Sequence, residues 1–181
     1  MTLRYPSLQA CAQILFPMIR TSMVEFEPAP PYGEERPGLL KLDSIFQLMQ
    51  RDHYYPDVFR KAAYLFCAII DGHPFSNGNK RVAVAVLSYF LIVNGFHISA
   101  PSMHAVREEL QEHFPKLHWE NVQAFHHAHE YFFYHLALIV ADRAQKGKMT
   151  FRQEQDAVVQ LLAFITAGVT KNVMVSTANH D

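Results

Sequence analysis

The stretch FRKAAYLFCAIIDGHPFSNGNKRVAVAVLSYFLIVNG, residues 59–95, places a polar loop between two strongly apolar segments. These segments are residues 64–70 and 82–93, and the second is apolar almost all round, which is typical of a buried helix. Asn94 and Gly95 follow it and form the usual C-terminal stop of a helix. We therefore expect two core helices that present the polar loop at one end.

The polar loop, HPFSNGNKR, combines a proton acceptor at His73, a turn and two cations. The first turn of a helix favours acidic side chains, yet here it carries Lys80 and Arg81, each of which opposes the helix dipole by about 0.3–1 kcal/mol. A bound polyanion would reverse that sign. Gly78 can take a positive φ and let the backbone approach an anion, and Asn79 can cap the helix or bind. The loop is thus equipped to hold a phosphate ester and to deprotonate a hydroxyl.

A structural interpretation of the same residues stays open. Lys80 and Arg81 could pair with Asp71 or with another acidic residue as a helix cap, and His73 alone could be an ordinary loop histidine. It is the combination of base, glycine turn and cation pair that favours a phosphate site.

HPFSNGNKR resembles the signature loop of the Fic/Doc family, whose common form is His-x-Phe-x-Asp/Glu-Gly-Asn-Gly-Arg. Lys80 matches the Doc-type branch, which has Lys in place of the second Gly, and only Asn77 departs from a defined position. The resemblance extends more loosely over residues 37–97. It implies an all-α, Fic-like helical bundle with a small β-hairpin flap.

The resemblance also implies an activity and a set of roles. It implies transfer of a phosphoryl or nucleotidyl group from ATP, or a related nucleotide, to a hydroxyl of a target protein, under the control of an antitoxin or another regulatory protein. Its implied catalytic residues are His73 as general base with Lys80 and Arg81, its phosphate-binding residues are Gly78, Asn79, Lys80 and Arg81, and its loop anchor is Phe75.

Two departures weaken the implied chemistry. Asn77 stands where the family has the carboxylate that holds magnesium, and an amide oxygen is a poor substitute for a carboxylate. Val84 stands where the family usually has a second Arg, which removes a phosphate contact. A magnesium ion at Asn77 is therefore a weak expectation. The alternative is a catalytically weakened member that binds a nucleotide or a protein.

The family's inhibitory motif, Ser/Thr-x-x-x-Glu-Gly/Asn, has only near matches in this chain. Thr21 and Glu25 are followed by Phe26, and Thr150 and Glu154 are followed by Gln155. We therefore expect control by a separate partner protein rather than self-inhibition.

Two further segments have both a functional and an ordinary interpretation. Gly38, Leu39 and Leu40 correspond loosely to the family's target-docking flap, or else form an ordinary loop with both leucines tucked into the core. His126, His127, His129 and Glu130 could ligate zinc, but their spacing matches no strong motif, so a solvated or partly buried aromatic-histidine face is favoured.

Composition limits the remaining choices. The chain has 181 residues, half of them hydrophobic, so residues 1–168 are expected to form one domain, with a partly disordered tail at 169–181. A net charge of −1 argues against nucleic-acid or membrane partners, while homo-oligomers stay open. Cys11 and Cys67 fit apolar helical patterns, and no apolar run reaches the ~20 residues that span a bilayer. With no cleavable signal expected either, we predict a cytoplasmic protein.

Helical periodicity runs through the rest of the chain, apart from a Pro-rich, acidic connector at 25–37. Ser44 resembles the start of a capping box, Pro56-Asp57 opens a helix, and Ser102 can cap another. The predicted helices outside the central one are 8–19, 44–51, 56–70, 102–113, 119–144 and 151–167.

Overall fold

The computed structural model describes residues 2–23, 28–115, 125–142 and 149–166. Every regular element within these ranges is helical, so the predicted all-α bundle is confirmed. None of the helices in these ranges is long and apolar enough to cross a membrane. The tail predicted at 169–181 lies outside the described residues, and the single domain at 1–168 stays a prediction.

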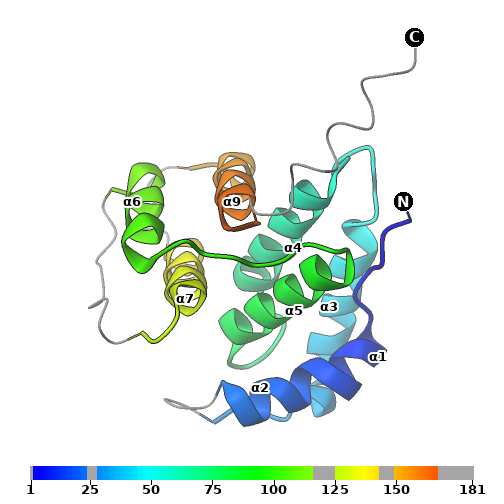
Figure 1. Cartoon of the computed structure of the whole chain (residues 1–181). Helices are drawn as coiled ribbons and strands as arrows, with labels where there is room; N and C mark the ends of the chain where they lie inside the picture. Colours follow the sequence, from blue (N-terminus) through cyan, green and yellow to red (C-terminus); the bar gives the residue numbers. More distant parts are fainter. Residues whose placement is uncertain (1, 24–27, 116–124, 143–148, 167–181) are drawn as a thin grey trace.

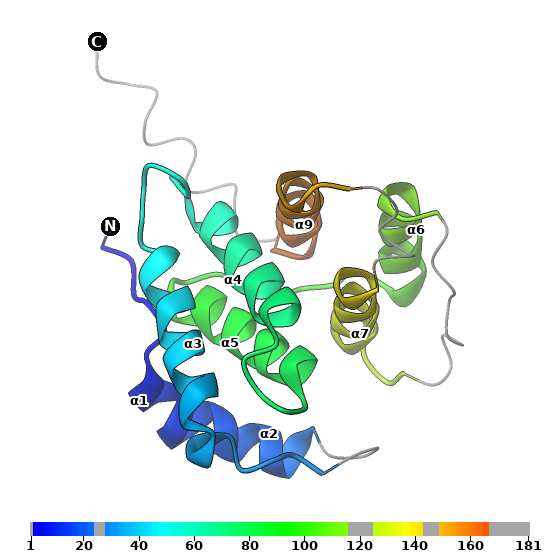
Figure 2. The same cartoon turned by 180° about the vertical axis from the view of Figure 1, so that it is seen from behind.

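Two helices, α4 (Val58–Gly72) and α5 (Asn79–Val93), lie side by side at the centre of the bundle (Figure 1). The other elements cover this pair from two sides, as the reverse view in Figure 2 also shows. On one side lie α1 (Leu8–Ala10), the π-helical turn Cys11–Leu15, α2 (Phe16–Ser22) and α3 (Arg36–Leu48); on the other lie α6 (Met103–His113), α7 (Ala128–Ala141) and α9 (Phe151–Thr166).

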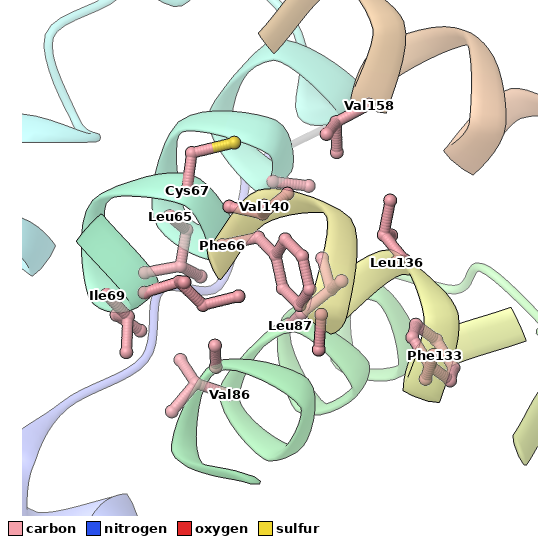
Figure 3. Packing of buried hydrophobic residues seen from close by; sticks show 14 of the residues in the cluster. Leu65, Phe66, Cys67, Ile69, Val86, Leu87, Phe133, Leu136, Val140 and Val158 are labelled. Atoms are coloured by element: carbon pink, nitrogen blue, oxygen red, sulfur yellow. The ribbon is translucent and has the colours of Figure 1, made fainter. Parts of the chain in front are cut away.

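One part of the core lies where α4 and α5 meet α7 and α9 (Figure 3), and the same cluster continues into α2 and α3. Fully burying one large apolar side chain stabilises a protein by about 1.5–3 kcal/mol relative to leaving it exposed, so this cluster gives the loop a rigid support. The side chains labelled in the figure are Leu65, Phe66, Cys67 and Ile69 from α4, Val86 and Leu87 from α5, Phe133, Leu136 and Val140 from α7, and Val158 from α9.

The two central helices begin and end where local signals predict. Asp57 caps α4, since its side chain accepts a hydrogen bond from the Arg60 N–H at 2.8 Å. At the end of α5, Gly95 has a φ of +84°. The Asn94 amide donates to the Phe90 carbonyl at 2.7 Å and to the Arg4 carbonyl at 2.8 Å, which ties the N-terminal segment to the end of α5.

The predicted helix 8–19 is present but contains a π-helical turn. Pro17 has no N–H and its ring crowds the carbonyl four residues earlier, so a regular α-helical ladder cannot pass through it. The Phe16 N–H bonds to the carbonyl of Cys11, five residues back, and the helix then continues to Ser22.

The β-hairpin flap predicted near residues 36–41 is wrong, because these residues form the first turns of α3. Pro37 lies in the first turn, where its missing N–H is tolerated. Gly38 has no side chain because the 73–81 loop packs closely against it: a Cβ there would lie 2.6 Å from the Pro74 carbonyl oxygen. The capping box at Ser44 is also wrong, since Ser44 lies inside α3 and donates to the Leu40 carbonyl at 2.9 Å.

The C-terminal helices agree with the sequence-based prediction except for the length of the helix that contains α7. Ser102 caps α6 by accepting from the Ala105 N–H at 3.1 Å, and α9 begins at Phe151 as predicted. The helix predicted over 119–144 is too long, because α7 spans Ala128–Ala141 and His127 before it has an extended backbone. Residues 116–124 lie outside the described part of the chain.

Candidate active-site loop

The 73–81 loop leaves the C-terminal end of α4 and enters the N-terminal end of α5, near the start of α3 (Figure 2). His73 has φ 45° and ψ 61°, and it is the only non-glycine residue of the described chain with a positive φ. A left-handed conformation costs an L-residue roughly 1–2 kcal/mol. Such strain is maintained where the surrounding structure fixes it, and functional sites are frequent examples.

The His73 ring is exposed, and its Nδ1 lies 3.3 Å from the Asp71 carbonyl oxygen. A carbonyl only accepts hydrogen bonds, so this contact favours the tautomer with the proton on Nδ1. In that tautomer Nε2 carries the lone pair. A ring nitrogen with a lone pair on an exposed histidine can accept a proton, which is what a general base requires.

Phe75 fixes the middle of the loop to the core. Its side chain is 3% exposed and packs edge-on against Tyr32, with ring centroids 5.0 Å apart, and against Phe16 at 5.7 Å. The burial matches the anchor role that the resemblance implies.

Asn79 holds the same residue through the backbone. Its Oδ1 accepts from the Phe75 N–H at 2.9 Å, and its Nδ2 donates to the Phe75 carbonyl at 2.8 Å. The Asn79 amide is thus engaged inside the loop rather than turned to a ligand. Any contact that Asn79 makes to a phosphate would come from its backbone N–H, in the first turn of α5.

Gly78 makes the turn that the sequence predicts. It has a φ of +72°, and a Cβ at this position would lie 2.1 Å from the Tyr32 hydroxyl oxygen. The glycine is therefore required twice, by its backbone conformation and by the close approach of Tyr32.

The two cations of the loop, Lys80 and Arg81, differ in exposure. Lys80 is exposed on the first turn of α5. Arg81 is partly buried, and its guanidinium donates to the Met23 carbonyl at 3.1 Å and to the Pro28 carbonyl at 3.3 Å. Arg81 thus contacts the last residue described after α2, Met23, and the first described residue of the connector, Pro28.

Glu35 is the site residue that sequence reasoning missed. It lies at the N-cap position of α3, and its carboxylate accepts from the Ser76 N–H at 2.8 Å and from the Ser76 hydroxyl at 2.9 Å. The two residues are 41 positions apart, and nothing local to either one announces the contact.

The residues predicted for target docking lie on the first turns of α3. Gly38 packs against Pro74 and Phe75 and so touches the loop directly. Leu39 packs partly against the core, whereas Leu40 is 70% exposed. The alternative in which both leucines are tucked into the core is wrong for Leu40.

Asn77 is exposed, and its side-chain oxygen accepts a hydrogen bond from the Gly78 N–H. Val84, at the position of the missing second Arg, is partly buried and packs against the core. In the inhibitory near matches, Glu25 and Phe26 lie outside the described residues, and Glu154 is 3% exposed in α9.

The histidine cluster shows no metal geometry. Its described members are exposed, and the rings of His127 and His129 stack 5.3 Å apart. Within the described ranges, no three His, Cys, Asp or Glu side chains come together in a way that could hold a metal ion.

The chain is similar to a known protein family over a range that includes the loop. Residues 13–91 match the model of the Fic/DOC family. This range contains the end of the π-helical turn, all of α2, α3 and α4, the whole 73–81 loop and most of α5. No curated protein and no solved structure matches the chain.

Proposed function

We propose, because residues 13–91 match the model of the Fic/DOC family, that this protein transfers a phosphoryl or nucleotidyl group from ATP, or a related nucleotide, to a hydroxyl of a target protein. The observation that carries the proposal is the strained, exposed His73 beside the N-terminus of α5, where Lys80 and Arg81 supply two positive charges.

The phosphates have a consistent place in this proposal. The first-turn N–H groups of α5, next to the positive φ of Gly78, form a partial positive charge that suits an anion. Lys80 can reach phosphate oxygens from the exposed side. Arg81, partly buried on the same turn of α5, adds a second positive charge that a phosphate would neutralise.

The reaction is an in-line displacement at phosphorus. His73 Nε2 accepts the proton of the target hydroxyl while its oxygen forms a bond to phosphorus. The bond from phosphorus to the leaving oxygen breaks, and that oxygen keeps the electron pair. Attack at the γ phosphate releases ADP, and attack at the α phosphate releases pyrophosphate. Positioning and charge neutralisation by Lys80 and Arg81 provide the remaining stabilisation.

A magnesium ion fits the site only together with phosphate oxygens. Magnesium is commonly bound by one or two carboxylates plus substrate phosphates, and the exposed Asn77 amide oxygen is a neutral, hard donor next to the phosphate-binding turn. When bound, the ion would neutralise charge on the phosphates.

Incubation of the protein with cell lysate and ATP labelled at either the α or the γ phosphate tests the proposal. Label in a target protein from γ alone means phosphoryl transfer, and label from α means nucleotidyl transfer. His73→Ala should abolish either signal. Absence of transfer with wild type, despite nucleotide binding, would favour the weakened binding member, which the Asn77 and Val84 departures support.

The target hydroxyl and an antitoxin or other regulatory protein remain the partners that we propose, and the cytoplasm the location. Cys11 and Cys67 are buried thiols that form no disulfide, which supports a reducing compartment. Co-purification of the tagged protein from its native cells would identify both partners.

A further inference from the structure

The connector before α3 delivers a carboxylate to the candidate active-site loop. Glu35 accepts two hydrogen bonds from Ser76, at 2.8 Å from the backbone N–H and at 2.9 Å from the hydroxyl, one to each carboxylate oxygen. Asn77 is the next residue of the loop, and consecutive Cα atoms are about 3.8 Å apart. A negative charge from a distant part of the chain is therefore hydrogen-bonded to the residue just before Asn77, where the loop carries only an amide.

The two bonds orient the carboxylate without saturating it. An ionised carboxylate has about four lone-pair sites on its two oxygens, and Ser76 uses one on each. Carboxylates that bind metals are themselves commonly held by such hydrogen bonds, which fix their direction. Glu35 is partly exposed, so a ligand can reach it.

The donor groups that the protein offers favour a cation bound together with a nucleotide over a cation bound alone. In the described chain no cluster of three ionisable ligands exists, so protein groups alone would not hold an ion. One carboxylate from Glu35, one amide oxygen from Asn77 and several phosphate oxygens form the kind of donor set that magnesium accepts.

We propose that Glu35 supplies the carboxylate ligand of the divalent cation that accompanies the nucleotide, in place of an acidic residue at Asn77. This inference rests on the proposed function, because the phosphate oxygens complete the site. Ser76 acts as the positioning residue that aims the Glu35 carboxylate.

A purely structural clamp makes a different prediction. If Glu35 only fastened the loop, loss of its charge would affect nucleotide binding equally with and without a divalent cation. If it binds the cation, the loss should appear only when the cation is present. The metal dependence of ATP affinity therefore separates the two roles.

The experiment is calorimetric titration of ATP into the full chain, in magnesium chloride and in EDTA. Glu35→Gln should weaken the magnesium-dependent affinity by about tenfold or more, because loss of even a group that only supports a metal ligand costs about 10–100-fold in metal affinity. Its affinity in EDTA should equal that of wild type. Glu34→Gln is the matched control, since Glu34 is exposed one residue earlier and should behave as wild type. Adding Asn77→Asp to Glu35→Gln should restore the magnesium effect.

A second measurement needs no substitution. In wild-type protein with ¹³C-labelled glutamate, manganese with ATP should broaden the carboxyl signal of Glu35 much more than that of Glu34. Equal broadening of the Glu34 and Glu35 signals would overturn this inference but not the proposed function. The same would follow if ATP affinity in Glu35→Gln kept the full magnesium dependence of wild type. Tighter ATP binding by Glu35→Gln in both buffers would also overturn it, since the carboxylate would then compete with the phosphates. Failure of wild type to bind ATP in either buffer would overturn the proposed function as well.

Discussion

The Asn79 side chain hydrogen-bonds to both backbone polar groups of Phe75. Its Oδ1 accepts from the Phe75 N–H at 2.9 Å, and its Nδ2 donates to the Phe75 carbonyl at 2.8 Å. Both bonds are buried, and they close the loop on itself across four residues. The amide is the only side-chain group that offers an acceptor and a donor in this arrangement, which gives Asn79 a stabilising role that its position in the loop signature does not reveal.

Substitution Asn79→Ala should lower the free energy of unfolding by about 1–3 kcal/mol for each Phe75 group left unpaired. Asn79→Asp keeps the acceptor but loses the donor and sets an oxygen against the Phe75 carbonyl, so it should also destabilise. Urea unfolding measures both. Lys80→Ala, at the exposed neighbouring position, should stay within about 0.5 kcal/mol of wild type; an equal loss there would mean that the loop is not held by Asn79.

His73 can be separated into its catalytic and conformational parts. His73→Ala and His73→Gly both remove the base, and both should abolish transfer to the target. Glycine tolerates the left-handed conformation that the loop imposes, so His73→Gly should be more stable than His73→Ala by roughly 1 kcal/mol. Thermal unfolding of the two variants gives the comparison. Equal stability would show that the loop relaxes once the ring is gone.

Gly78→Ala should be strongly destabilising, by roughly 2–4 kcal/mol, because it combines an unfavourable backbone conformation with a clash against the Tyr32 hydroxyl. Tyr32→Phe removes the clashing oxygen, after which the nearest atoms to the new Cβ lie at 3.1 and 3.2 Å. The double variant should therefore recover part of the loss, as a double-mutant cycle in urea would measure. Simple additivity of the two changes would contradict the contact.

The Cys11 thiol should be inert in the folded protein. Burial raises the pKa of Cys11 from its ordinary value of 9.0 to about 12, so the reactive thiolate is scarce. The folded state favours the protonated form, and this contribution to stability is fully present below the unfolded pKa and is lost as the pH rises toward 12. Alkylation followed by peptide mapping should show modification of Cys11 only after unfolding, and the melting temperature should fall from about pH 9 upward. Rapid native alkylation would refute the burial.

Asn77→Asp should raise magnesium-dependent transfer, because a carboxylate adds a full negative charge beside a dication that an amide meets only with a dipole. Each ~1.4 kcal/mol of transition-state stabilisation gained is a tenfold increase in rate. Initial rates with γ- and α-labelled ATP are the measurement. A flat or lower rate, with His73 still essential, would mean that the Glu35 carboxylate already supplies the charge and that the Asn77 amide is a working part of that different metal arrangement.

Sequence patterns predict the centre of this fold well and its long-range contacts poorly. Helices α4 and α5 can be predicted because Asp57 marks the start of the apolar run in α4, and Asn94-Gly95 marks the end of the run in α5. Helix α3 is not, because Gly38 resembles a loop signal, whereas its small size serves packing against Phe75.

The site shows the same division. The loop residues are neighbours in sequence, so their roles can be inferred together, although the left-handed backbone of His73 is uncommon for a residue other than glycine. The carboxylate of Glu35 reaches Ser76 from 41 residues away, and only tertiary packing brings the two together.

The helical form of residues 36–48 also limits how another protein can be recognised on this side of the loop. A strand edge displays unpaired backbone groups, and a peptide of almost any sequence can add to it as one more strand. Helix α3 keeps its interior backbone groups paired within itself. What it displays near the loop is side chains, with Leu40 the most prominent of the apolar ones. For any partner that bound this surface, discrimination would therefore come from shape and side-chain chemistry, and a single substitution at Leu40 would change it without touching the loop.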